Sequence, residues 1–166
     1  MKKDVLKVLF LGGLGLFVSI FGYPFLHELG HVVASVLTGA DILEMNIFPI
    51  SNVLCDVSNV GDNGCVIIGF GGLVFPALCS LFIPQKWFVC WYTRALLQGM
   101  CALATTISIV SLIFEINHQD DMIQVLRFWE YGKGLLLFVL FCYLFGLILI
   151  IAMDGPHKRI YKYFEI

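Results

Sequence analysis

The sequence has few charged residues, and this scarcity limits the kind of protein it can encode. Asp, Glu, Lys and Arg make up 13% of the 166 residues, about half the share found in a soluble domain. Apolar residues make up 60%, and the mean hydropathy is +0.92. A water-soluble fold of this size cannot bury so much apolar surface, so the composition predicts that the lipid bilayer is the solvent.

Features of several other protein classes are also missing. The net charge is −2 and no basic stripe alternates with aromatic residues, so we expect no nucleic-acid partner. No repeat or low-complexity linker divides the chain, and residues 1–166 suffice for one domain only. The six cysteines do not form a disulfide scaffold, because four lie in apolar runs. A bond between Cys55 and Cys65, which share a polar stretch, is left open.

Four long apolar blocks stand out. The first, from Val5 to Leu37, exceeds the roughly 20 residues that cross a bilayer as one straight helix. Pro24 follows Gly22-Tyr23 within it, which favours one kinked helix over two short segments. The other blocks cover residues 65–83, 87–114 and 134–153. The chain is therefore predicted to be an all-α membrane protein, a bundle of about four transmembrane helices.

A polar stretch after the first block differs from the rest. Residues 42–48 and 53–57 are typical of short strands, with Pro49 and Ser51-Asn52 between them as turn residues. A hairpin cannot cross lipid with open edges, so we expect it at the membrane interface or against the helices.

Positive charges divide unequally between the two sides of such a bundle. With four crossings, one side collects seven cationic residues, and the other receives only Arg127 and Lys133. The positive-inside rule then places both termini in the cytoplasm of what is predicted to be a prokaryotic cell membrane. The seven residues are Lys2, Lys3, Lys7, Lys86, Lys158, Arg159 and Lys162.

The most specific pattern is H-E-x-x-H at residues 27–31, inside the first apolar block. On a helix His27 and His31 share one face and can bind one metal ion, and Glu28 lies beside them to take a proton from water. Ionisable groups within a membrane are costly and indicate function. The pattern predicts a zinc site with Glu28 as general base, rather than a polar contact between helices.

Catalytic zinc takes a third protein ligand. The second and third blocks return the chain to the side of the histidines, whereas Asp154 follows one more crossing and would lie about 30 Å away. We choose Asp120 as the third ligand, with its neighbour Asp121 as second choice. An N-cap on the following helix is the alternative role for either residue. The weaker candidates are Glu115 and His118.

These features resemble the site-2 protease family of intramembrane zinc metallopeptidases, in particular its small bacterial and archaeal members. The likeness rests on H-E-L-G-H at 27–31, Thr38-Gly39, the strand pair to Asp56, the run Gly-Gly-Leu-Val-Phe-Pro at 71–76, and Asp120. Many members carry the third ligand in an Asn-Pro…Asp-Gly segment, of which Asp154-Gly155 has only the last two residues. Gln119-Asp120 is similar to the Ser-Asp pair of small relatives.

The resemblance implies a metalloendopeptidase that cleaves membrane-embedded or membrane-adjacent protein substrates, with zinc on His27, His31 and Asp120. An edge of the hairpin could hold an unwound substrate by strand addition. Two alternatives remain: a non-catalytic membrane interaction module that keeps a zinc site, and a small metal or ion transporter. The lipid bilayer is an expected partner in every case, and the oligomeric state is left open.

Overall fold

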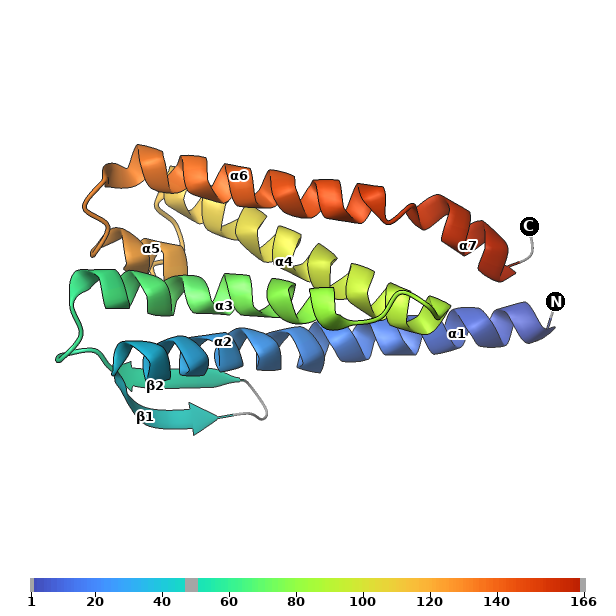
Figure 1. Ribbon diagram of the computed structural model, residues 1–166, viewed down its shortest axis with the longest axis horizontal. Coiled ribbons are helices and arrows are strands. Elements are labelled where there is room, and N and C mark those ends of the chain that lie inside the picture. The colour runs from blue at the N-terminus through green and yellow to red at the C-terminus, as the bar shows by residue number, and fades with distance from the viewer. Residues whose placement is uncertain (1, 47–50, 165–166) are drawn as a thin grey trace.

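The computed structural model describes residues 2–46 and 51–164, which form a helical bundle with one small antiparallel sheet (Figure 1). The helices are α1 (Lys2–Phe17), η1 (Val18–Gly22), α2 (Tyr23–Thr38), α3 (Asp62–Phe82), α4 (Phe88–Phe114), α5 (Asp121–Leu126), α6 (Gly132–Met153) and α7 (Pro156–Phe164). The strands are β1 (Asp41–Asn46) and β2 (Asn52–Asp56).

Within residues 2–46 and 51–164, four helical segments are long and apolar enough to cross a membrane: Asp4–Thr38, Asp62–Phe82, Phe88–Phe114 and Gly132–Phe164. They coincide with the four apolar blocks, so the predicted helical bundle is confirmed. Large apolar side chains cover its outside, and Leu37 and Phe82 are 78% and 87% exposed. Such a surface is unfavourable in water and matches a lipid environment.

The first segment is one continuous helical stretch that contains a π-helical turn. Pro24 lies in the first turn of α2, immediately after the π turn η1. A proline inside a helix lacks a backbone N–H and clashes with the carbonyl four residues earlier. The wider turn before Pro24 relieves that conflict without ending the helix. Of the two forms considered from the sequence, one kinked helix or two short segments, the structure shows a single continuous helix, with a π turn before Pro24.

The two strands form an antiparallel hairpin beside α2, with Asp41 opposite Asp56 and Asn46 opposite Asn52 (Figure 1). The predicted pair is confirmed, although Ile47, Phe48 and Pro49 lie outside the described residues. The Ser35 hydroxyl lies 3.0 Å from the Cys55 sulfur and connects α2 with β2. Cys55 and Cys65 are both free thiols.

The closest helix pair is α2 with α3, and glycines make the contact. A Cβ atom on Gly30 would lie 2.2 Å from the Gly71 carbonyl oxygen, and one on Gly71 would lie 2.5 Å from the Gly30 carbonyl oxygen. Only glycine allows two helix backbones to approach this closely. The histidines of α2 are thereby pressed against α3.

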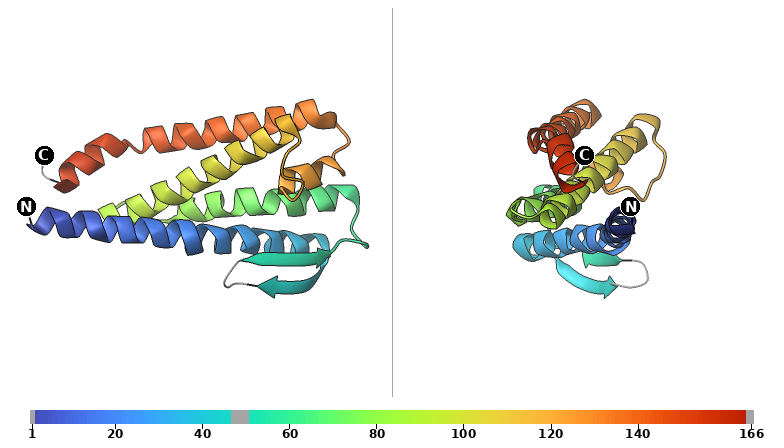
Figure 2. Two further views of the ribbon diagram at one scale, coloured as in Figure 1. Left: turned by 180° about the vertical axis from the view of Figure 1, so that it is seen from behind. Right: turned by 90° about the vertical axis from the view of Figure 1, so that its right-hand side faces the viewer.

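The loop after α4 returns to the level of the H-E-x-x-H motif, as the crossing count predicted. The short helix α5 packs beside α3, and Met122 and Val125 enter a core with Leu73 and Leu112. The end of α6 lies at the opposite end of the bundle from α5 (Figure 2), and Asp154, the next residue, contacts Arg94 and Gln85 there. This position excludes Asp154 from the histidine site.

Candidate metal centre

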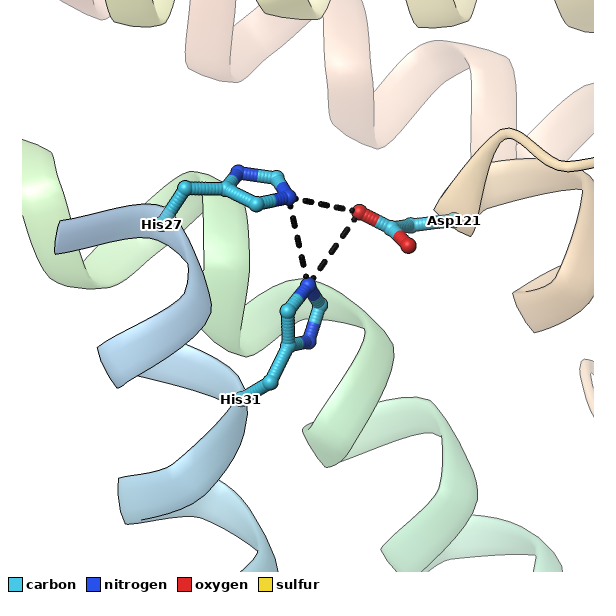
Figure 3. A group of neighbouring side chains, drawn as sticks. All are labelled: His27, His31 and Asp121. Atoms are coloured by element: carbon cyan, nitrogen blue, oxygen red, sulfur yellow. Dashed lines mark hydrogen bonds and ion pairs between the residues drawn. The ribbon is translucent and has the colours of Figure 1, made fainter. Parts of the chain in front are cut away.

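Three donor atoms from two distant parts of the chain converge on one point (Figure 3). Asp121 Oδ2 lies 3.0 Å from His27 Nε2 and 3.3 Å from His31 Nε2, and the two nitrogens are 3.2 Å apart. The histidines lie one turn apart on α2, and Asp121 is the first residue of α5. Two imidazoles and one carboxylate form a group that can hold a metal ion.

The spacing of the three atoms fits a tetrahedral ion. With metal–ligand bonds of about 2.0–2.1 Å, tetrahedral zinc holds neighbouring ligand atoms about 3.3 Å apart. The observed separations of 3.0–3.3 Å match this value. Three protein ligands leave the fourth position open, as catalytic zinc sites require.

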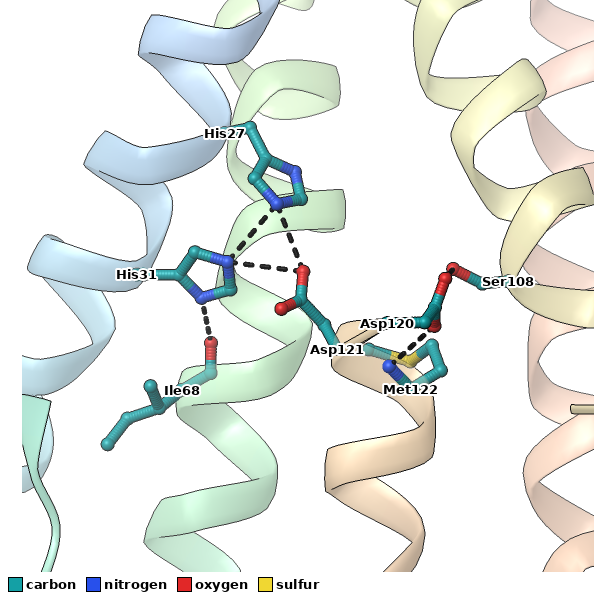
Figure 4. Close-up of polar contacts among 7 residues, drawn as sticks. All are labelled: His27, His31, Ile68, Ser108, Asp120, Asp121 and Met122. Atoms are coloured by element: carbon teal, nitrogen blue, oxygen red, sulfur yellow. Dashed lines mark hydrogen bonds and ion pairs between the residues drawn. The ribbon is translucent and has the colours of Figure 1, made fainter. Parts of the chain in front are cut away.

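The hydrogen bond behind His31 sets the chemistry of its other nitrogen (Figure 4). His31 Nδ1 lies 2.8 Å from the carbonyl oxygen of Ile68, which only accepts hydrogen bonds. We therefore infer that Nδ1 carries the proton and that Nε2 presents a lone pair in the neutral imidazole. A backbone carbonyl in this position orients metal-binding histidines and makes them more basic.

A cation resolves an otherwise unfavourable contact in this arrangement. Neutral His31 Nε2 and Asp121 Oδ2 are both acceptors, and they lie 3.3 Å apart. His27 Nε2 can donate one proton to one of them and leaves the other without a donor. A metal ion or an additional proton is therefore needed among the three atoms.

Gly72 on α3 forms the wall behind both imidazoles. A Cβ atom at this position would lie 2.5 Å from His31 Nε2 and 2.6 Å from His27 Cε1. Since a side chain at this position would displace both imidazole rings, Gly72 provides the space in which they meet. Neighbouring glycines of the run thus have different roles: Gly71 contacts the Gly30 backbone, and Gly72 makes room for the imidazoles, a role that no sequence pattern indicated.

The structure places Asp121, rather than Asp120, beside the two histidines. Asp120 turns away from the histidines: its Oδ1 accepts the Met122 N–H at 2.9 Å, and its Oδ2 accepts the Ser108 hydroxyl at 3.0 Å (Figure 4). Asp120 is thus the N-cap of α5, the alternative role considered from the sequence. Asp121, the second choice, takes the place expected for Asp120.

The two aspartates differ in their electrostatic surroundings. Burial opposes ionisation of Asp121, but the neighbouring His27 and His31 imidazoles outweigh it, so the pKa of Asp121 lies well below its ordinary value. Burial raises the pKa of Asp120, against the effect of its hydrogen bonds from Met122 and Ser108. Asp121 is therefore the better anionic ligand.

Glu28 borders the metal-binding group and is open to two cavities. One cavity, of about 540 Å³, is lined by Glu28, His31, Asp121 and residues of β2. The other, of about 360 Å³, is lined by His27, Glu28, Asp121 and the ring of Tyr23. Val53 of β2 lines the larger cavity together with Glu28. A molecule in either cavity can reach both Glu28 and the metal-binding atoms.

Of the predicted residues, the structure brings His27, Glu28 and His31 together and leaves Glu115 and His118 outside the group. The sequence could not reveal the Ile68 carbonyl, since any residue supplies one. No protein-family model, curated protein or solved structure compared with this chain matches it.

Proposed function

We propose that this protein is a membrane-embedded zinc metalloendopeptidase in which His27, His31 and Asp121 bind the metal and Glu28 is the general base. The observation that carries the proposal is the convergence of three donor atoms within 3.0–3.3 Å of one another. The neighbouring Glu28 gives the group a proton acceptor, which a purely structural zinc site does not need. The H-E-L-G-H resemblance to site-2 proteases agrees with this reading.

The chain supplies the parts of a hydrolytic mechanism. A zinc ion, when bound, would act as a Lewis acid on the scissile carbonyl and lower the pKa of water. Glu28 takes the proton from the attacking water and later delivers it to the leaving amine. The Ile68 carbonyl orients His31, and Gly72 leaves room for both rings. The apolar helices around the site limit the access of other water molecules.

The larger cavity accounts for how a peptide reaches this group. The cavity is lined by residues 52–55 of β2 and by Glu28 and His31. An extended peptide segment along β2 brings its carbonyls toward Glu28, whereas a helical segment keeps its carbonyls bonded within the helix. The preferred substrate is therefore a membrane protein whose helix unwinds locally. The charge pattern supports a cytoplasmic position for both termini.

The decisive experiment compares metal content and cleavage in Glu28→Gln. Purified full-length protein in lipid vesicles would be assayed on a single-span reporter protein with a Gly-Pro pair in its transmembrane helix. We expect Glu28→Gln to retain zinc and to lose cleavage by at least about a hundredfold, the scale of a general base. Glu130→Gln, the same substitution at an exposed glutamate that lines neither cavity, is the control and should retain cleavage.

Other outcomes would favour the two alternatives. Full cleavage by Glu28→Gln would refute the proposed role of Glu28. Zinc binding without cleavage of any unwound reporter by the wild type would favour an interaction module. Zinc flux into vesicles that depends on His27 and Asp121 would favour a transporter.

A further inference from the structure

The end of the bundle opposite the metal centre is formed in part by α7 and by the turn at residues 83–87, which joins α3 to α4. Arg159 on α7 donates from Nη1 to the Gln85 carbonyl at 2.9 Å and from Nη2 to Gln85 Oε1 at 3.0 Å. The Tyr163 ring stacks on the Phe88 ring, with the two centroids 3.9 Å apart. These contacts hold α7 against the turn and the start of α4.

The two arginines at this end are bonded within the protein. Arg159 Nε donates to the Asp154 carbonyl at 3.1 Å, and the guanidinium carbon lies 5.7 Å from the centre of the Trp91 ring. Arg94 Nε lies 3.3 Å from Asp154 Oδ2. Both arginines therefore fix the position of α7 and of the end of α6, and neither is free to bind a ligand.

Three lysines of the same two segments are free. Lys86, Lys158 and Lys162 are exposed, and none of them makes a hydrogen bond or an ion pair with another described residue. Lys158 and Lys162 lie one turn apart on α7 and share a face of that helix. Lys86 follows Gln85, the residue that binds Arg159. Three ammonium groups without a protein counter-ion thus belong to two segments that are bonded to each other.

The lengths of two helices set the depth of these lysines in a membrane. The helices α3 and α6 have 21 and 22 residues, which is about 32 Å and 33 Å of helix. Both lengths match the hydrocarbon core of a bilayer, about 30 Å. The turn and α7 follow directly after these helices, so their lysines lie at the level of the lipid headgroups. Trp87 and Tyr161, which are 64% and 56% exposed, are residues typical of this level.

We propose that Lys86, Lys158 and Lys162 bind the headgroup of an anionic phospholipid. The oxygens of a lipid phosphate accept hydrogen bonds from ammonium groups, and the attraction to an anionic membrane surface amounts to about fivefold in affinity per lysine. Phosphatidylcholine carries a cationic group beyond its phosphate, so a headgroup with a net negative charge fits better. The lysines lie at headgroup depth beside apolar surface such as Phe82, which favours a lipid over a soluble phosphate. The proposal does not depend on the peptidase activity.

The test measures lipid preference with the full-length protein in vesicles. The probes are brominated phosphatidylglycerol and brominated phosphatidylcholine, which quench tryptophan fluorescence on contact. Trp129→Phe is used as the background, so that Trp87 and Trp91, both at the α7 end, give the signal. We expect this protein to prefer the anionic lipid by at least about tenfold, because three lysines contribute. Substitution of all three lysines by Gln should bring the preference close to one.

Single variants and a soluble competitor make the test decisive. Lys158→Gln should lower the preference by about fivefold, whereas Lys133→Gln, the same substitution before α6 at the other end of the bundle, should leave it unchanged. Lys158→Arg should retain it, because the charge is kept. Equal quenching by both lipids, or a preference that survives the triple substitution, would overturn the proposal. Displacement of the lipid by millimolar inorganic phosphate would also overturn it, in favour of a soluble phosphate ligand.

Discussion

Gly30 and Gly71 meet backbone to backbone, and their contact sets the distance between the helix that carries the histidines and the helix behind them. Gly30 is also the residue between Leu29 and His31 in the metal motif. Gly30 therefore belongs both to the helix contact with α3 and to the H-E-x-x-H motif. The obstruction at either glycine would be a carbonyl group of the main chain, which cannot rotate away as a side chain can.

Gly30→Ala and Gly71→Ala should each destabilise the protein by about 3 kcal/mol, the upper range for overpacking. The measurement is thermal unfolding in detergent micelles. Gly99→Ala on α4 is the control, because a Cβ there meets nothing within 4 Å. An unchanged midpoint for Gly30→Ala would show that α2 and α3 do not pack as described.

Gly72→Ala should act differently, because its Cβ would meet side chains rather than backbone. The His27 and His31 rings can rotate away, so we expect a small loss of stability and a large loss of bound metal. Metal content by mass spectrometry, measured beside the unfolding midpoint, separates the two effects. Wild-type metal content in Gly72→Ala would contradict the placement of the rings.

Asp121→Asn and Asp120→Asn should differ in metal binding. Asp121→Asn removes the anionic ligand and should lower metal affinity by at least about tenfold, a lower limit taken from outer-shell substitutions. Asp120→Asn keeps an N-cap that can still accept the Met122 N–H, and it should bind metal like the wild type. A competition titration with a zinc chelator reports both values, and the opposite order would restore Asp120 as the ligand.

Asp120 also predicts a pH dependence of stability in the metal-free protein. Its folded-state pKa is raised, so the ionised form is disfavoured on folding. Well below a pH of about 3.9 the carboxyl is protonated in both the folded and the unfolded protein, and it then does not lower the free energy of unfolding. As the pH rises through the folded-state pKa, the free-energy cost of the buried, ionised carboxylate reaches its full value. Asp120→Asn should therefore be more stable than the wild type at neutral pH, with an advantage that disappears in acid; unfolding midpoints across pH test this.

Removal of the metal should lower stability only where the three ligands are intact. At a free zinc concentration 100 times the dissociation constant, binding contributes about 2.7 kcal/mol, or roughly 5–10 °C in the unfolding midpoint. A chelator should abolish this increment in the wild type and have no effect on His27→Ala. A wild-type midpoint that is insensitive to the chelator would argue against a metal site.

The helices and the position of the loop after α4 could be predicted from the sequence, because they depend on the length of single apolar segments and on the number of crossings. Apolar runs of the right length predict the spans, and histidines four apart share a face in any helix. Counting crossings placed the loop after α4 beside the motif and Asp154 at the far end, and the structure agrees.

The choice between Asp120 and Asp121 required the tertiary structure. Neighbouring residues at a helix start point in directions about 100° apart, and a shift of one residue in the start of α5 exchanges their roles. The start is decided by Met122 and Val125, which are buried against Leu73 and Leu112 from α3 and α4. The N-cap preference of aspartate was the one local signal available, since a capping Asp120 is turned away and leaves Asp121 free.

The sequence by itself therefore determined the helices, their order and the residues able to bind metal, because hydrophobic length and helical period are properties of short segments. The tertiary structure alone decided which carboxylate meets the histidines and which glycine makes room for their rings. These properties arise where segments distant in the chain come within a few ångströms, and no pattern within one segment encodes them.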